Sequence, residues 1–88
     1  MLDKTTRVDE WKSNAATILD VRPILYAGGE PFAQILEAAS AIALNHSLLL
    51  IAPFEPAPLY DVLDVRGFSH ATEHIAADEW VVCFIRER

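Results

Sequence analysis

The chain has 88 residues, 52% of them hydrophobic and 23% charged, and its mean hydropathy is +0.21. This length supports one domain with one core, in a size range where about 60–65% of the unfolded surface becomes buried. Seven basic residues against thirteen acidic ones give a net charge of −6, which argues against binding to nucleic acid. The hydrophobic content is high for so small a soluble chain, so burial against a partner is a hypothesis from composition alone.

No segment of the sequence is typical of a membrane protein or an exported one. The first residues lack a basic region followed by an apolar run, and the longest fully apolar stretch, residues 48–54, is too short to span a membrane. We therefore expect a cytoplasmic protein with no membrane-bound part. Its single cysteine, Cys83, excludes an internal disulfide.

The chain begins with a polar segment that leads into a strand. Residues 1–16 are polar and mixed, which indicates a tail or a short helix. Residues 17–21 are mostly β-branched or apolar and predict a strand with Leu19 and Val21 on its core face. The first sixteen residues are therefore treated as an extension of the domain.

A glycine turn and a helix follow the first strand. After Gly28 and Gly29, apolar residues recur at helical spacing and predict an amphipathic helix over about 31–44. Pro31 at its first position costs no hydrogen bond, because the first backbone N–H groups of a helix have no partner within it.

The middle of the chain predicts a buried strand and a second helix. Residues 47–54 are continuously apolar, as in a strand covered on both faces. Residues 55–58 then open a helix that Gly67 ends.

Two further strands complete the element order β-α-β-α-β-β. They cover residues 68–76 and 80–86 and are joined by a hairpin through Asp78 and Glu79. The second and fourth strands are apolar on both faces, so they are expected at the centre of the sheet. Right-handed crossovers then predict the order 1-2-4-3, with the fourth strand antiparallel and both helices on one face. The predicted fold is α+β, a two-layer α/β sandwich forming a single domain over residues 17–88.

This arrangement leaves one face of the two central strands without a predicted cover. Four or five large apolar side chains in water there would forgo roughly 6–15 kcal/mol of burial free energy, which a small domain can scarcely tolerate. Either the N-terminal segment folds back with Trp11 over the sheet, or another molecule covers it. The candidate partner-binding residues are Trp11, Trp80, Leu49 and Ile51.

Several short motifs of the chain are typical of one family. They are Leu19-Asp20-Val21-Arg22-Pro23, Gly28-Gly29-Glu30-Pro31, Glu55-Pro56-Ala57-Pro58-Leu59-Tyr60, Gly67-Phe68 and Trp80-Val81-Val82. Over about residues 17–87 the chain resembles the family catalogued as domain of unknown function 2249, which looks like a relative of the TusA/SirA sulfur carriers. The resemblance implies a two-layer sandwich with the element order given above.

The sulfur carriers have a Cys-Pro-x-Pro motif at the start of their first helix, where a thiolate accepts persulfide sulfur. The matching residues here are Gly28-Gly29-Glu30-Pro31, so a proline is retained but glycine stands where the cysteine would be. Glycine cannot carry sulfur. What the resemblance still implies is a domain that docks onto other proteins.

Backbone amides at the predicted helix start suggest a site for a small anion or other ligand. Its candidate residues are Gly28, Gly29, Glu30, Arg22 and Tyr60. Tyr60 and Glu55, around the start of the second helix and beside the two glycines, would shape a shallow pocket with Phe54. The alternative is a plain capped turn, because Glu30 already places a carboxylate at the positive end of the helix dipole.

His70, His74 and Cys83 are the remaining candidates for chemistry. On a strand, a spacing of four residues puts the two histidines about 13 Å apart, too far to share one ion. We therefore expect no metal site and no cofactor. Alternation places Cys83 inside the sheet, which favours a buried thiol over a reactive one.

No catalytic motif occurs in the sequence, so no catalytic residue is assigned and we expect no enzyme activity. The leading hypothesis is a non-catalytic accessory or protein-binding module that associates through its open sheet face, with a protein partner or as a homo-oligomer. One alternative is a redox or sulfur-trafficking protein that uses Cys83 or the histidines. The other is a sensor of small anions or ligands at Gly28-Gly29.

Overall fold

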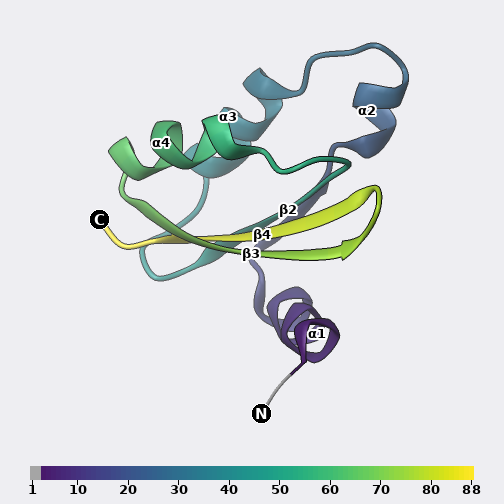
Figure 1. Ribbon diagram of the computed structural model, residues 1–88. Helices are drawn as coiled ribbons and strands as arrows, with labels where there is room; N and C mark the ends of the chain where they lie inside the picture. Colours follow the sequence, from purple (N-terminus) through teal and green to yellow (C-terminus); the bar gives the residue numbers. More distant parts are fainter. Residues whose placement is uncertain (1–2) are drawn as a thin grey trace.

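The structure is a computed structural model that describes residues 3–88, and it contains four helices and four strands in that range. The predicted α+β class is confirmed, with one helix over residues 22–26 that the sequence analysis had not predicted and another in the segment predicted as a tail or short helix (Figure 1). In chain order the elements are α1 (Lys4–Asn14), β1 (Thr17–Asp20), α2 (Arg22–Tyr26), α3 (Phe32–Ser40), β2 (Ser47–Ala52), α4 (Ala57–Val65), β3 (Phe68–Ala76) and β4 (Glu79–Arg86).

The sheet has the predicted strand order, β1-β2-β4-β3. β1 and β2 pair in parallel, whereas β4 runs antiparallel to both β2 and β3. α3 and α4 lie together on one face of the sheet, as right-handed crossovers require (Figure 1). The position of the two most apolar strands at the centre of the sheet is therefore confirmed.

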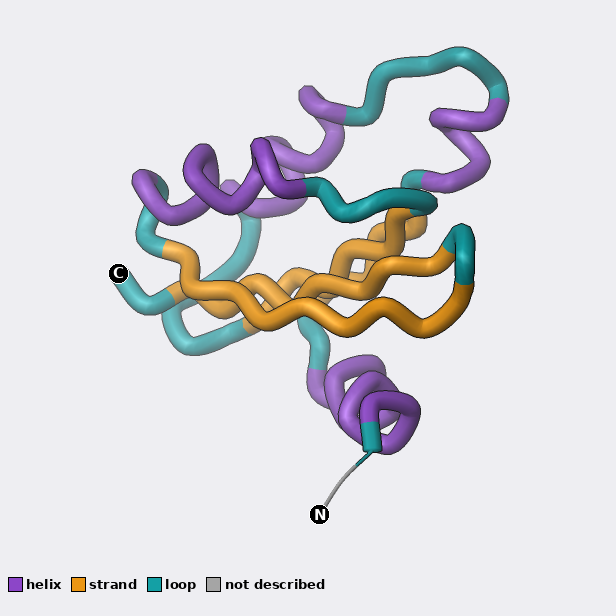
Figure 2. The backbone as a smooth tube through the Cα atoms, viewed as in Figure 1, coloured by secondary structure: helices purple, strands orange, loops and turns teal. Residues whose placement is uncertain are grey.

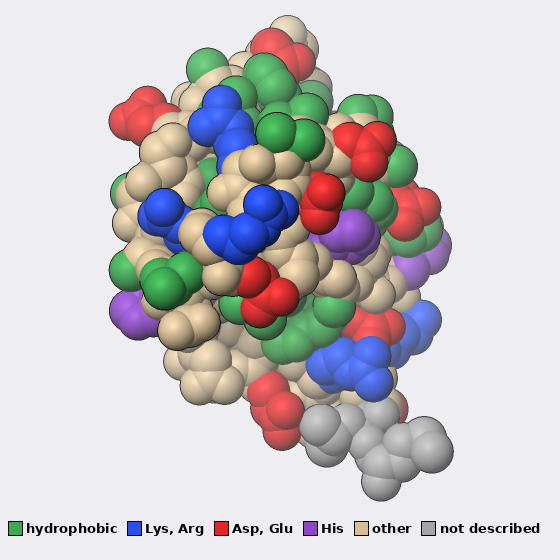
Figure 3. Space-filling model, turned by 90° about the vertical axis from the view of Figure 1, so that its left-hand side faces the viewer, with side chains coloured by type: hydrophobic (Ala, Val, Ile, Leu, Met, Phe, Trp, Pro, Cys, Tyr) green, Lys and Arg blue, Asp and Glu red, His purple; other side chains and the backbone are tan. Residues whose placement is uncertain are grey.

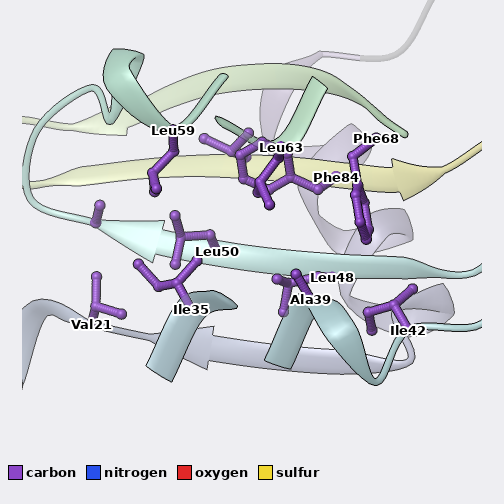
Figure 4. Packing of buried hydrophobic residues seen from close by; sticks show 12 residues of the cluster. Val21, Ile35, Ala39, Ile42, Leu48, Leu50, Leu59, Leu63, Phe68 and Phe84 are labelled. Carbon is purple, nitrogen blue, oxygen red and sulfur yellow. The ribbon is translucent and has the colours of Figure 1, made fainter. Parts of the chain in front are cut away.

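The larger core lies between the sheet and the helix pair α3 and α4. Leu50 of β2 and Phe84 of β4 pack in one cluster with Ile35 of α3 and Leu63 of α4, and none of these side chains is more than 3% exposed (Figure 4). Side chains repeat every two residues on one face of a strand and about every 3.6 residues on one side of a helix. These four side chains therefore lie on the surfaces of the sheet and the helix pair that face each other.

The other face of the sheet is covered by α1, so the prediction of an open sheet face is wrong (Figure 2). Val8 of α1 is buried against Leu49 and Ile51, which are 0% and 6% exposed, and Trp11 packs beside them. Of the two covers considered, the N-terminal segment is the one that the structure shows. The segment predicted as a tail or short helix is a helix over residues 4–14; Met1 and Leu2 lie outside the described residues.

Polar contacts fasten α1 to the edge strand β3. The Asp3 carboxylate accepts a hydrogen bond from the Thr6 amide and caps the helix. Lys4 Nζ donates to the His74 carbonyl at 2.6 Å, and Arg7 forms a 2.7 Å ion pair with Glu73. The contact from Lys4 occupies the His74 carbonyl, a backbone acceptor beside the bulge of β3. Both the occupied acceptor and the bulge hinder pairing of this edge strand with another chain.

One helix and one strand end two or more residues before their predicted ends. The helix predicted over 31–44 begins at Phe32 and ends at Ser40, because the chain turns through 3₁₀-type hydrogen bonds and then through Asn45, whose φ is +66°. The strand predicted over 47–54 ends at Ala52, before a proline that cannot donate to the sheet. None of the helices in residues 3–88 combines the length and the apolar character needed to cross a membrane.

Candidate functional site

The predicted glycine turn is the C-terminal cap of α2, a helix that the sequence analysis missed. Gly28 has a φ of +83°, and its amide donates to the Leu25 carbonyl at 3.0 Å. The Gly29 amide donates to the Ile24 carbonyl at 2.8 Å. Together these bonds form a Schellman motif. Both amides are therefore used within the fold and do not point at a ligand.

The N-terminus of α3 is capped from within the chain as well. Glu30 Oε1 accepts a hydrogen bond from the Phe32 amide. A carboxylate already lies where an anionic ligand would bind, next to the positive end of the helix dipole. The alternative of a plain capped turn therefore describes this segment, and the arrangement disfavours an anion.

Arg22 lies two residues after the end of β1, and its side chain binds the carboxylate of Asp20. Arg22 Nε and Nη2 donate to the two carboxylate oxygens at 3.0 and 2.9 Å, and its amide also donates to Asp20 Oδ1. These hydrogen bonds hold the pKa of Asp20 below its ordinary value of 3.8. The guanidinium therefore serves the turn from β1 into α2.

Replacing Asp20 with asparagine is expected to lower the free energy of unfolding by about 0.5–1 kcal/mol at neutral pH, as for other partly exposed ion pairs. Because the folded-state pKa of Asp20 is depressed, its contribution is present above the ordinary pKa and is lost as pH falls through the folded-state value. Urea unfolding of both proteins across the acid range checks this, with Asp9→Asn on an exposed carboxylate as control. A difference that stays constant down to strongly acid pH would contradict the assignment.

Tyr60 ties α4 to the edge strand β3 and does not join the glycine turn. Its hydroxyl lies 2.7 Å from Thr72 Oγ1 and donates to Glu55 Oε2 at 3.1 Å. Its ring stacks on His70 with centroids 3.9 Å apart. Partial burial raises the pKa of Tyr60. All of these contacts are structural ones.

The two histidines lie on β3, as predicted, and each stacks on a different aromatic ring. His74 stacks on Trp80, centroid to centroid 3.9 Å, while His70 stacks on Tyr60. Within residues 3–88 no cluster of three or more His, Cys, Asp or Glu side chains is placed to hold a metal ion.

The four candidate partner-binding residues do not form one surface. Leu49 and Ile51 are buried beneath α1, with Trp11 packed against the same cluster. Successive side chains of a strand point to opposite faces, and Trp80 is three residues before Cys83 on β4. Cys83 packs under α1, so Trp80 lies on the other face of the sheet. Cys83 is 5% exposed, and burial raises the pKa of its thiol, so the thiolate form is disfavoured.

A groove lies where the parallel strands β1 and β2 end, between the N-terminal parts of α3 and α4. Val21 and Leu50 line it from the sheet, and Ile35 and Leu59 line it from the two helices (Figure 4). Its volume is about 240 Å³, and Glu30 is the one charged residue among those that line it. We call it the apolar groove. Its place at the carboxyl ends of parallel strands is where open α/β sheets commonly bind ligands.

The rim of the apolar groove is aromatic, and prolines line the groove beside it. Phe32 and Phe54 are 42% and 53% exposed. The buried Pro31 and Pro56 and the exposed Pro58 also line the groove and offer no backbone N–H to a ligand. Exposed aromatic rings on a rigid rim suit an apolar group, because little conformational freedom is lost on binding.

One family model matches the chain, over residues 18–86, and its description is "Uncharacterized conserved protein (DUF2249)". The chain belongs to the DUF2249 family. The matched segment includes all of the sheet except Thr17 and every residue of the apolar groove, whereas α1 precedes it. No curated protein and no solved structure matches the chain significantly.

The sequence analysis of this DUF2249 domain found part of the groove and missed the rest. It named Phe54 and Glu30 among its candidates but grouped them with Tyr60, Glu55 and the glycines, none of which lines the groove. The missed residues include Phe32 and three prolines. The available signal was an aromatic residue beside proline in each of the two loops that follow the parallel strands.

Proposed function

We propose that this DUF2249 domain is a non-catalytic protein-binding module whose binding site is the apolar groove. The observation that carries the proposal is the groove itself, an apolar cavity with two half-exposed phenylalanines at its mouth. Aromatic residues at the centre of an interface contribute a large share of binding energy in protein complexes.

The size of the groove favours a protein side chain over a whole metabolite. Pockets for drug-sized ligands have volumes of about 300–1,000 Å³, whereas this one has about 240 Å³. A cavity of that size accepts one or two apolar side chains of a partner, with the exposed Phe32 and Phe54 extending the contact around them. The proposal therefore keeps the binding role expected from the sequence and moves it from the sheet face to the helix pair.

Two alternatives have less support. Sulfur or redox chemistry needs an accessible thiolate, whereas Cys83 is buried and its pKa is raised. A sensor of small anions needs free donors at the glycine turn, whereas the amides of Gly28, Gly29 and Phe32 already donate within the chain.

The proposal predicts that Phe54→Asp weakens binding of the natural partner about tenfold or more, because a carboxylate replaces an apolar anchor at the groove mouth. Tagged wild-type and variant chains are recovered from the native cell, copurifying proteins are identified, and the purified partner is then titrated. The matched control is Val65→Asp, at a residue of α4 that is 81% exposed and does not line the groove. Equal binding by the two variants would overturn the proposal.

A further inference from the structure

One carboxylate lines the apolar groove, and a second follows the rim residue Phe54 in the sequence. Glu30 lines the groove; Oε1 accepts a hydrogen bond from the Phe32 amide, while Oε2 makes no hydrogen bond within residues 3–88. Glu55 is exposed and directly follows Phe54 in the chain; its Oε2 accepts the hydrogen bond from Tyr60, while Oε1 makes no hydrogen bond within residues 3–88. Neither carboxylate forms an ion pair with any residue in the described range. The mouth of the groove is therefore negative.

No basic side chain of the described residues offsets this charge at the groove. No lysine or arginine lines the groove, and Arg22, which lies in α2, is already held by Asp20.

Other arginines lie beyond the opposite, C-terminal ends of α3 and α4. There Arg86 donates to the Ile42 carbonyl and Arg88 to the Asp64 carbonyl. Figure 3 looks at the side of the molecule on which the C-terminus lies, and blue Lys and Arg side chains group near its centre. These arginines thus lie away from the apolar groove and do not neutralise Glu30.

A second copy of the chain is a poor occupant for this site. A two-fold axis brings the same patch of each copy together. Glu30 and Glu55 of one copy would then face the same residues of the other, and like charges in an interface oppose association. With a net charge of −6, the whole chain repels its own copies as well.

We infer that the apolar groove takes a segment of a basic protein in which a large apolar side chain stands next to a lysine or arginine. The apolar side chain fills the cavity, and the neighbouring cation meets Glu30 Oε2, with the exposed Glu55 beside Phe54 adding to the negative charge. This inference rests on the proposed function and adds the chemistry of the partner. The exposed ion pairs select the partner and contribute little affinity by themselves.

Selection of short random peptides by display against the immobilised full chain tests the inference. Wild-type protein is expected to select peptides with a large apolar residue beside Lys or Arg. The double variant Glu30→Gln/Glu55→Gln is expected to select apolar peptides without basic enrichment, and to bind a synthetic wild-type-selected peptide about three- to tenfold more weakly. Added salt should weaken that peptide's binding to the wild type more than to the double variant.

The variant Phe54→Asp separates failure of this inference from failure of the proposed function, because it alters the groove itself. Circular dichroism checks that the variant is folded. Selected peptides that lose binding to Phe54→Asp but carry no basic residue would overturn this inference and leave the proposed function standing. Peptides that bind Phe54→Asp as well as wild type, or an absence of selected peptides, would overturn both. A dimer in sedimentation that Phe54→Asp abolishes would make a second copy the occupant and overturn the basic partner.

Discussion

Replacing Phe84 with alanine is expected to lower the free energy of unfolding by about 3–5 kcal/mol. Phe84 is fully buried on the central strand β4, and its ring lies 6.3 Å from that of Tyr60 and 6.2 Å from that of His70. Removing the ring leaves a cavity between the sheet and α4 that neighbouring side chains fill only in part. Domains are stable by about 5–15 kcal/mol, so this one change removes a large part of the total.

Urea unfolding followed by circular dichroism measures the loss at Phe84. The matched control is Ile85→Ala, one residue further along β4, where the side chain points to the opposite face and is 38% exposed. We expect less than half the loss there, because truncation of a partly exposed side chain leaves a smaller cavity. Equal losses at the two positions would contradict the assignment of the main core to the α3–α4 face.

Replacing Val8 with alanine is expected to speed modification of the Cys83 thiol by about thirtyfold. Val8 is the one buried side chain of α1, and it packs in the same cluster as Cys83. Truncating it costs about 2 kcal/mol of burial and cavity free energy. Since each 1.4 kcal/mol is a factor of ten in an equilibrium, the population with α1 detached rises accordingly.

The rate of reaction with a thiol-specific chromogenic reagent measures this opening directly, because Cys83 is the only cysteine of the chain. Val65→Ala on exposed α4 is the matched control and should leave the rate unchanged. A weak dependence of the rate on urea would show that α1 opens locally, without unfolding of the whole domain. An unchanged rate in Val8→Ala would show that α1 does not control access to this face.

Most of the sheet was predictable because its signals are local. Leu48 to Ala52 are apolar at every position, which occurs in strands covered on both faces, and Gly67 marks the end of α4 with a φ of +96°. Crossover handedness then leaves few ways to arrange four strands. The family resemblance read from short motifs is likewise confirmed by the match over residues 18–86; the relation to the sulfur carriers remains a prediction.

The site was harder to predict, since its parts come from three separate segments. Gly28 and Gly29 suggested a ligand turn, whereas the short helix α2 before them, with Pro23 tolerated in its first turn, makes the pair a helix cap. Phe32 lies inside the amphipathic helix predicted over 31–44, and only its 42% exposure at the N-terminal end of α3 makes it part of the rim.

The sequence by itself determined the strand order, the helix pair and a sheet with two apolar faces, because alternation and helical spacing are properties of neighbouring residues. Only the tertiary structure decided what covers the second face. α1 contributes a single buried side chain, Val8, so the spacing of apolar residues along this helix is too weak to predict where it packs. Likewise the apolar groove exists only because β1 and β2 end side by side, which brings Glu30, Phe32 and Phe54 together from loops that no local pattern connects.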